Sequence, residues 1–239
     1  MKKIYILDYL YPPRCPVCDK PILQNQSFDG FCTTCLEKLP IIRGKRCCKC
    51  GRALSDLEKE YCSDCLKYGW AHIYDKGLSL CTYDDVLRDM IYRLKYGKRS
   101  EYANALGKLL ADAFAVALKR AGAEGVIAVP LHENRIRKRG YNQAELLAKS
   151  FCRHSGIPFY EHYVERVKDT KPLKSMSRSE RQNNLKKAFK IGRNDVKLKV
   201  SIVIDDIYTT GSTIDSMAAV LKEAGVSKVY FLTVAIGDD

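Results

Sequence analysis

The chain has 239 residues, of which 46% are hydrophobic and 29% are charged, and its formal net charge is +13. That composition is globular, and no apolar run approaches the ~18–20 residues that would cross a bilayer. Asp8 interrupts the apolar stretch near the N-terminus and no small-residue cleavage site follows, which argues against a secretory signal. We therefore expect a cytoplasmic protein, in which metal binding rather than disulfide formation explains why the chain has as many as eleven cysteines.

Four C-x₂-C pairs stand in the first 65 residues, with thirteen residues between the first two pairs and eleven between the last two. Each pair places two thiolates on one side of a tight turn, and two pairs complete a tetrahedral site for Zn²⁺. We expect a double zinc-ribbon domain over residues 1–70, holding one or two structural zinc ions, ahead of a second domain over 71–239. The expected zinc ligands are Cys15, Cys18, Cys32, Cys35, Cys47, Cys50, Cys62 and Cys65.

Two features of these metal sites stay open on spacing alone. Cys47 and Cys48 are adjacent, and we take Cys47 as the ligand because it keeps two residues between the partners. The first and third pairs could also share one metal in a cross-braced arrangement. A redox role is disfavoured, because the pairs lack thioredoxin-like flanks.

The second domain begins with a β-α-α-β order. A strand is expected over 77–83, and Asp84 is expected to cap a helix with apolar residues on one face. A second helix follows over about 102–121, and a buried strand over 126–129. This order predicts an α/β domain with a doubly wound, mostly parallel sheet.

A strongly basic segment follows that strand. Residues 135–199 contain 18 Lys/Arg against 6 Asp/Glu, which is nearly the whole excess charge of the chain. Its first part is a predicted loop after Pro130 that carries Arg135, Arg137 and Arg139, at the strand end where such folds bind ligands. A solvated basic face is one explanation, and a polyanion such as pyrophosphate or nucleic acid is the other.

The central motif is the run from Ser201 to Thr213. Ile202 to Ile204 predict a buried strand, which would end in the adjacent carboxylates Asp205 and Asp206. A small hydroxyl-rich loop and a helix start come next, an order that favours an anion site beside groups that hold a vicinal diol or a hydrated Mg²⁺. The loop consists of Thr209, Thr210, Gly211, Ser212 and Thr213.

An ordinary strand–turn–helix is the simpler interpretation of this motif, but two carboxylates directly before the loop make it much less favoured. No P-loop or dinucleotide-binding glycine pattern occurs in the chain. The thirteen residues closely resemble the 5-phosphoribosyl-1-pyrophosphate (PRPP) signature of type I phosphoribosyltransferases. That resemblance implies a phosphoribosyltransferase-like fold, with PRPP and Mg²⁺ as ligands.

A second resemblance covers nearly the whole chain. Four features of this sequence stand in the same order as in the ComF family of competence proteins. They are the C-x₂-C pairs within residues 15–65, the L-K-Y at 94–96, the segment R-x-R-G-Y-N-Q-A-E-L-L-A after V-P-L, and the 201–213 motif. The resemblance implies a role in DNA uptake during natural transformation, on or near single-stranded DNA and the uptake machinery. It also implies a lid over PRPP in the polar segment 166–189, with Leu173 where a glutamine is expected. The residues that match the lid pattern are Arg166, Thr170, Ser177, Arg178, Glu180, Arg181 and Asn184.

Three functions are therefore weighed. The favoured one is a PRPP-binding protein in DNA uptake; the others are an active phosphoribosyltransferase with an unidentified acceptor, and a non-catalytic nucleic-acid-binding protein. Asp205 and Asp206 would be the catalytic pair, and Pro130, the 209–213 loop and the three arginines would bind PRPP. The candidate DNA contacts are Lys95, Tyr96, Lys98, Arg137, Arg139, Tyr141, Arg178 and Arg181.

Overall fold

A four-stranded parallel sheet forms the centre of the computed structural model, which describes residues 12–22, 27–55, 57, 59–168, 188–192 and 196–237. The strand order is β3-β8-β7-β4, and every neighbouring pair is parallel. The expected α/β class with a parallel sheet is therefore confirmed. The strands are β3 (Lys76–Thr82), β4 (Gly125–Ala128), β7 (Val200–Tyr208) and β8 (Lys228–Ile236).

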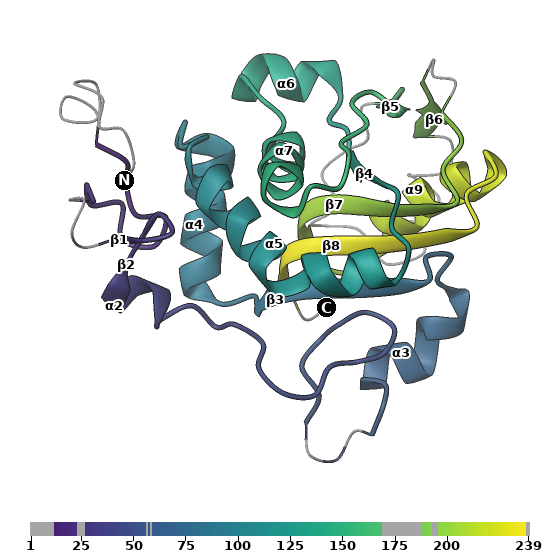
Figure 1. The fold of residues 1–239 in the computed structure, drawn as a ribbon, viewed down its shortest axis with the longest axis horizontal. Helices are drawn as coiled ribbons and strands as arrows, with labels where there is room; N and C mark the ends of the chain where they lie inside the picture. The colour runs from purple at the N-terminus through teal and green to yellow at the C-terminus, as the bar shows by residue number, and fades with distance from the viewer. Residues whose placement is uncertain are drawn as a thin grey trace.

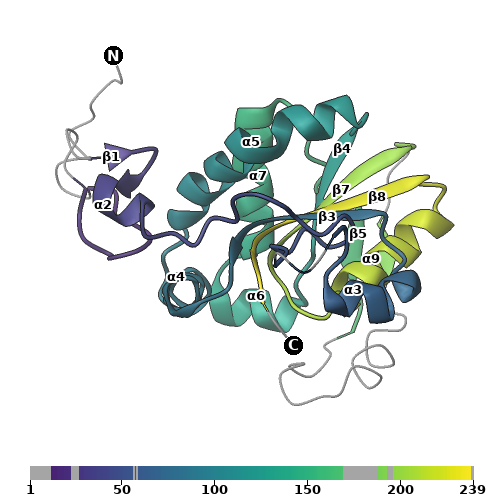
Figure 2. The same cartoon turned by 90° about the horizontal axis from the view of Figure 1, so that it is seen from below.

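Helices cover both faces of this sheet, with α5 and α7 on one side and α9 and α3 on the other (Figure 2). Asp84 caps α4 as expected, because its carboxylate accepts a hydrogen bond from the Leu87 amide at 2.9 Å. Apolar side chains from α4, α5 and α7 form one core cluster with Ile202, Ile204 and Leu232 of the sheet. The helices are α3 (Ser63–Tyr68), α4 (Asp85–Tyr96), α5 (Tyr102–Arg120), α7 (Gln143–Ser155) and α9 (Ser212–Glu223).

The boundaries expected around the ligand site were wrong in two places. Strand β7 continues to Tyr208, because β8 pairs with it as far as Ile236, so Asp205 and Asp206 lie inside the strand and not beyond its end. The basic stretch after Pro130 is not a loop: Glu133–Arg139 forms helix α6, capped by His132 and ended by left-handed Gly140. A short antiparallel pair, β5 (Val164–Arg166) with β6 (Phe189–Ile191), lies before β7 in the chain.

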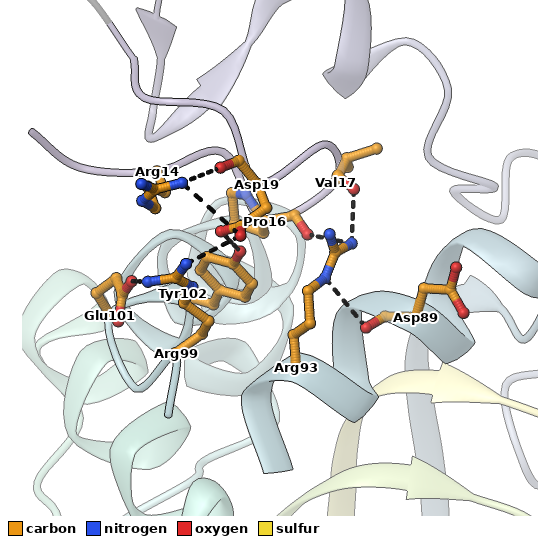
Figure 3. Close-up of polar contacts among 9 residues, drawn as sticks. All are labelled: Arg14, Pro16, Val17, Asp19, Asp89, Arg93, Arg99, Glu101 and Tyr102. Carbon is orange, nitrogen blue, oxygen red and sulfur yellow. Dashed lines mark hydrogen bonds and ion pairs between the residues drawn. The ribbon is translucent and has the colours of Figure 1, made fainter. Parts of the chain in front are cut away.

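The first Cys₄ group lies beside α4 at one end of the molecule (Figure 1), with β1 (Ser27–Phe28), β2 (Phe31–Cys32) and α2 (Thr33–Leu36). Figure 3 shows its contacts with the helices. Arg93 of α4 donates to the carbonyls of Val17 at 2.7 Å and Pro16 at 3.3 Å. Asp19 accepts from Arg99 at 2.9 Å and from the Tyr102 hydroxyl at 2.5 Å. These bonds hold the pKa of Asp19 below its ordinary value, although partial burial opposes its charge.

The second Cys₄ group packs on the α/β core itself. Its four cysteines share a buried cluster with Tyr74, Tyr208 and Phe231. The approach is close at Gly77 of β3, where an added Cβ would lie 2.0 Å from the Phe231 ring and 2.8 Å from the Cys50 carbonyl oxygen. Both Cys₄ groups thus contact residues beyond position 71, and the division into domains at 1–70 and 71–239 stays a prediction.

Candidate functional site: a carboxylate pair and a hydroxyl loop at the sheet edge

The cysteines form two four-thiol groups, within each of which all Sγ atoms lie within 4.8 Å of one another. The Sγ–Sγ distances of 3.9 Å between Cys18 and Cys32 and 3.7 Å between Cys50 and Cys62 suit a tetrahedral zinc, whose sulfurs lie ~3.8 Å apart. The pairs combine in chain order, without cross-bracing, and Cys48 is exposed outside the second group. The two groups are therefore consistent with structural zinc. They are Cys15, Cys18, Cys32 and Cys35, and Cys47, Cys50, Cys62 and Cys65.

The candidate ligand site begins at the carboxylates of β7. The side chain of Asp206 is 5% exposed and forms an ion pair with the Lys95 ammonium from α4. It also accepts a hydrogen bond from the Gln143 amide at the start of α7, at 3.1 Å. The Asp205 carboxylate accepts a bond from the Asp206 backbone amide at 2.8 Å. Lys95, a candidate DNA contact in the sequence, thus lies within the site as the partner of Asp206.

The two carboxylates have opposite electrostatic environments. Burial raises the pKa of Asp205 well above its ordinary value, and the neighbouring negative charge of Asp206 adds to the effect. Burial also opposes charge on Asp206, but the Lys95 ammonium and the hydrogen bonds from Lys95 and Gln143 lower its pKa. Two adjacent carboxyl groups thus have pKa values that are shifted in opposite directions, an arrangement that recurs at functional sites.

A polar chain extends from Asp206 to the protein surface. Gln143, which donates to Asp206, accepts a hydrogen bond from Arg139 of α6. The Arg139 guanidinium lies over the Tyr96 ring, 5.0 Å from its centroid. Tyr96 in turn contacts Tyr92, one turn earlier on α4, with ring centroids 5.2 Å apart. Helices α4, α6 and α7 therefore join the carboxylate pair to an exposed aromatic pair.

The hydroxyl loop follows β7 directly. Thr209 is exposed, Thr213 is half-buried, and the residues between them are buried. Gly211 has a φ of +79°, which only glycine adopts without strain, and it is the N-cap of α9. The hydroxyls of Thr210 and Ser212 are hydrogen-bonded at 2.9 Å. The loop thus brings two hydroxyl groups to the first turn of a twelve-residue helix, where the dipole favours an anion.

The remaining candidate residues are more scattered. Arg137 is exposed on α6 and pairs with Glu133 at 3.4 Å, whereas Arg135 and Pro130 are half-buried. Lys98 is exposed after α4, and the Tyr141 hydroxyl donates to the Leu94 carbonyl at 2.5 Å. Of the lid residues only Arg166 is described, on β5; the others, with the DNA candidates Arg178 and Arg181, lie outside the described residues.

Sequence reasoning missed three residues that the structure places at or beneath the site. Gln143 was expected as a helix start and as part of the family motif, without a role at the carboxylates, and its position after the basic stretch was the available signal. Asp215, in the first turn of α9, binds His72 from the segment that follows the second Cys₄ group, with 2.7 Å between Oδ2 and Nδ1. No sequence pattern links residues so far apart.

Comparisons with known proteins agree with the Cys₄ geometry. Residues 6–66 match the model of a double zinc ribbon domain. Among solved structures, a purine phosphoribosyltransferase from Pyrococcus horikoshii overlays on 53% of this chain and 79% of its own, with 15% identity and a TM-score of 0.33. The fold assignment rests on the parallel sheet and its helices. None of the described helices is long and apolar enough to span a membrane.

Curated relatives match over most of their own length. Competence protein F of Haemophilus influenzae is 31% identical over 208 residues, covering 84% of this chain and 88% of that protein. DNA utilization protein YhgH of Salmonella typhimurium is 29% identical over 223 residues, or 91% and 94%. Competence protein ComFC of Bacillus subtilis is 29% identical over 228 residues, or 88% and 89%. With this identity and coverage, and with paired Cys₄ groups ahead of a parallel α/β sheet, the chain belongs to the competence protein F (ComF) family.

Proposed function

We propose that this protein binds PRPP at the carboxyl-terminal ends of its parallel strands and acts in DNA uptake, in contact with single-stranded DNA. The observation that carries the PRPP part is the continuous arrangement of Asp205, Asp206 and the hydroxyl loop on one strand–helix connection. The loop would hold the 5-phosphate, and the carboxylates would accept hydrogen bonds from the ribose hydroxyls. The names of the relatives support the role in DNA uptake.

The surrounding residues have matching roles in this proposal. Arg139 is linked to Asp206 through Gln143 and would bind the pyrophosphate; Arg135 and Arg137 would add positive charge. Because the Lys95 ammonium already neutralises the Asp206 carboxylate, Asp205 and Asp206 do not form a cation site by themselves. The expected Mg²⁺ would therefore arrive with the pyrophosphate of PRPP.

An active phosphoribosyltransferase is the second candidate, favoured by the raised pKa of Asp205. In that case the loop and arginines would stabilise charge as pyrophosphate departs. Release of pyrophosphate from PRPP with a nucleobase, an amine or a DNA strand as acceptor would separate this function from binding alone.

The PRPP proposal predicts that ligand binding depends on the two loop hydroxyls. Thr210→Val is expected to weaken PRPP binding by roughly ten-fold, because a hydrogen bond to a charged phosphate contributes ~1.5–3 kcal/mol. Calorimetric titration with Mg²⁺ and PRPP measures this change. Ser216→Ala is the control, because its hydroxyl donates to the Ser212 carbonyl behind the loop. An unchanged melting temperature of the wild type with excess PRPP and Mg²⁺ would reject the proposal.

The DNA proposal predicts that the aromatic pair on α4 stacks with unpaired bases. Tyr92 and Tyr96 are each 63% exposed, and Arg139 flanks them, which fits a single strand with its bases unstacked. The double variant Tyr92→Ala/Tyr96→Ala is expected to weaken oligothymidine binding by about 30-fold or more, at ~1–3 kcal/mol per stacked base. Fluorescence anisotropy measures the affinity.

Trp70→Ala is the matched control for this experiment, because Trp70 is 86% exposed but lies in the 3₁₀ helix after α3, on another element than Tyr92 and Tyr96. Charge reversal at Arg137 and Arg139 should also lower the salt dependence of binding, since each phosphate contact releases counterions. Equal affinity of the tyrosine double variant and the wild type would remove α4 from the DNA-binding surface.

A further inference from the structure

The segment 72–74 connects the second zinc group to the underside of the hydroxyl loop. It follows α3 and the short 3₁₀ helix Gly69–Ala71 directly in the chain. Lys49, which lies between the zinc ligands Cys47 and Cys50, donates through its ammonium to the Tyr74 carbonyl at 2.5 Å and contacts the His72 carbonyl at 3.4 Å. The segment is thus fixed on one side to a zinc knuckle.

On its other side, the segment binds both flanks of the loop. Before the loop, the Tyr208 hydroxyl is hydrogen-bonded to the Tyr74 hydroxyl at 2.7 Å, and both side chains are buried. After the loop, Asp215 binds His72 at 2.7 Å and accepts from the Ile73 backbone amide at 2.8 Å. These contacts bracket residues 209–213 at the strand end and in the first helical turn.

The turn of the loop at Gly211 packs directly against the side chains of Tyr208 and His72. A Cβ added at Gly211 would lie 2.6 Å from the Tyr208 hydroxyl oxygen and 3.0 Å from Cε1 of His72. The loop backbone therefore has little room to move toward the zinc group. Apolar side chains would fill this volume equally well, but directional hydrogen bonds fix orientation as well as volume.

We infer that His72 and Tyr74 are positioning residues for the hydroxyl loop, through which the second zinc group holds the phosphate-binding turn in its shape. The inference rests on the proposed function, since it requires PRPP to bind at this loop. It assigns the second Cys₄ group to the ligand site, in addition to its part in the core. Neither residue would touch PRPP, because both lie beneath the turn.

The test compares variants that remove one contact each. Tyr74→Phe keeps the ring and is expected to weaken PRPP binding about five-fold, the equivalent of one neutral hydrogen bond. His72→Phe leaves the buried Asp215 carboxylate without its imidazole partner, and a loss of roughly ten-fold or more is expected. His72→Asn, whose side-chain amide can replace the Nδ1 donor, should restore most of the affinity. Zinc content and oligothymidine affinity should match the wild type in every variant.

Two further variants separate positioning from stability. Tyr208→Phe removes the same hydrogen bond as Tyr74→Phe, so the double variant should bind PRPP no more weakly than either single one. Ser79→Ala is the control, because it deletes a buried hydroxyl pair with Thr233 at 2.8 Å, between β3 and β8. It should lower the melting temperature and leave PRPP affinity unchanged.

Unchanged PRPP affinity in His72→Phe and Tyr74→Phe, with a lower melting temperature, would overturn the inference and leave the proposed function standing. His72→Asn as weak as His72→Phe would also overturn it. A wild type that does not bind PRPP rejects both the proposed function and this inference.

Discussion

Replacement of Cys50 by serine should lower the zinc content by one ion per chain and destabilise the α/β core. Cys50 is 1% exposed and shares its cluster with Tyr74, Tyr208 and Phe231. A structural zinc site contributes ~10–16 kcal/mol of binding free energy in small domains, which equals or exceeds the ~5–15 kcal/mol stability of a typical protein. We expect the melting temperature to fall by more than ~15 °C. Calorimetry measures this fall, and metal analysis of the same sample measures the zinc content.

Two other cysteine variants make this prediction specific. Cys48→Ser should keep both zinc ions and its melting temperature, because Cys48 is exposed outside the second group. Cys15→Ser should also lose one zinc ion but cost less stability, since Cys18 and Cys32 of its group are only half-buried. Loss of zinc from the Cys48 variant, or two zinc ions in the Cys50 variant, would contradict the assigned ligands.

The neighbouring variants Asp205→Asn and Asp206→Asn should change stability in opposite directions at pH 7.5. The folded pKa of Asp205 lies above its unfolded value of about 3.8, so folding favours its protonated form and ionisation costs stability as the pH rises. Asparagine removes that cost, and we expect the melting temperature to rise. The gain should shrink as the pH falls toward 4, where the carboxyl group becomes neutral in the unfolded state as well as in the folded one.

Asp206 behaves in the reverse way. Its folded pKa is lowered, so its ionised form stabilises the protein above about pH 3.8, and this stability is lost as the pH falls through the folded pKa. Asp206→Asn leaves the Lys95 ammonium without its partner and should cost ~1–3 kcal/mol. Thermal unfolding from pH 4 to 8 measures both differences.

Both asparagine variants should lose PRPP affinity by roughly ten-fold or more, because each removes a charged acceptor for ribose hydroxyls. Asp205→Asn would then be more stable and less able to bind, as expected where function requires an unfavourably placed charge. Thr82→Ser, at the exposed end of β3, is the control on the same sheet. A destabilised Asp205→Asn variant at pH 7.5 would contradict the raised pKa.

The elements and the two Cys₄ groups were predictable because their signals are local. Cysteine spacing and the apolar runs at 126–129 and 202–204 depend on neighbours in the sequence, so they survive without knowledge of the tertiary fold. The extent of β7 was not predictable, since residues 205–208 are held in the strand by pairing with β8. Helix α6 was missed because its arginines and lysine suggested a ligand loop, although they are good helix formers.

The site was predictable only on the β7 side. The sequence identifies Asp206 and the loop, but the Lys95 ammonium that sets the charge of Asp206 comes from a helix more than a hundred residues earlier. His72 has no pattern around it, and the motif that contains Gln143 does not indicate that its amide donates to Asp206. Their roles arise from packing of α4, α7 and the second zinc group against the sheet, which no local periodicity encodes.

The strand order has a consequence for synthesis on the ribosome. Edge strand β3 pairs along its length with β8, which emerges about 150 residues later. The cysteine knuckles can therefore capture metal while β3 still lacks its neighbour, and closing so long a chain segment is entropically costly and slow. A nascent chain arrested before residue 228 should hold zinc yet expose an unpaired strand edge, which is a template for aggregation and for chaperone binding.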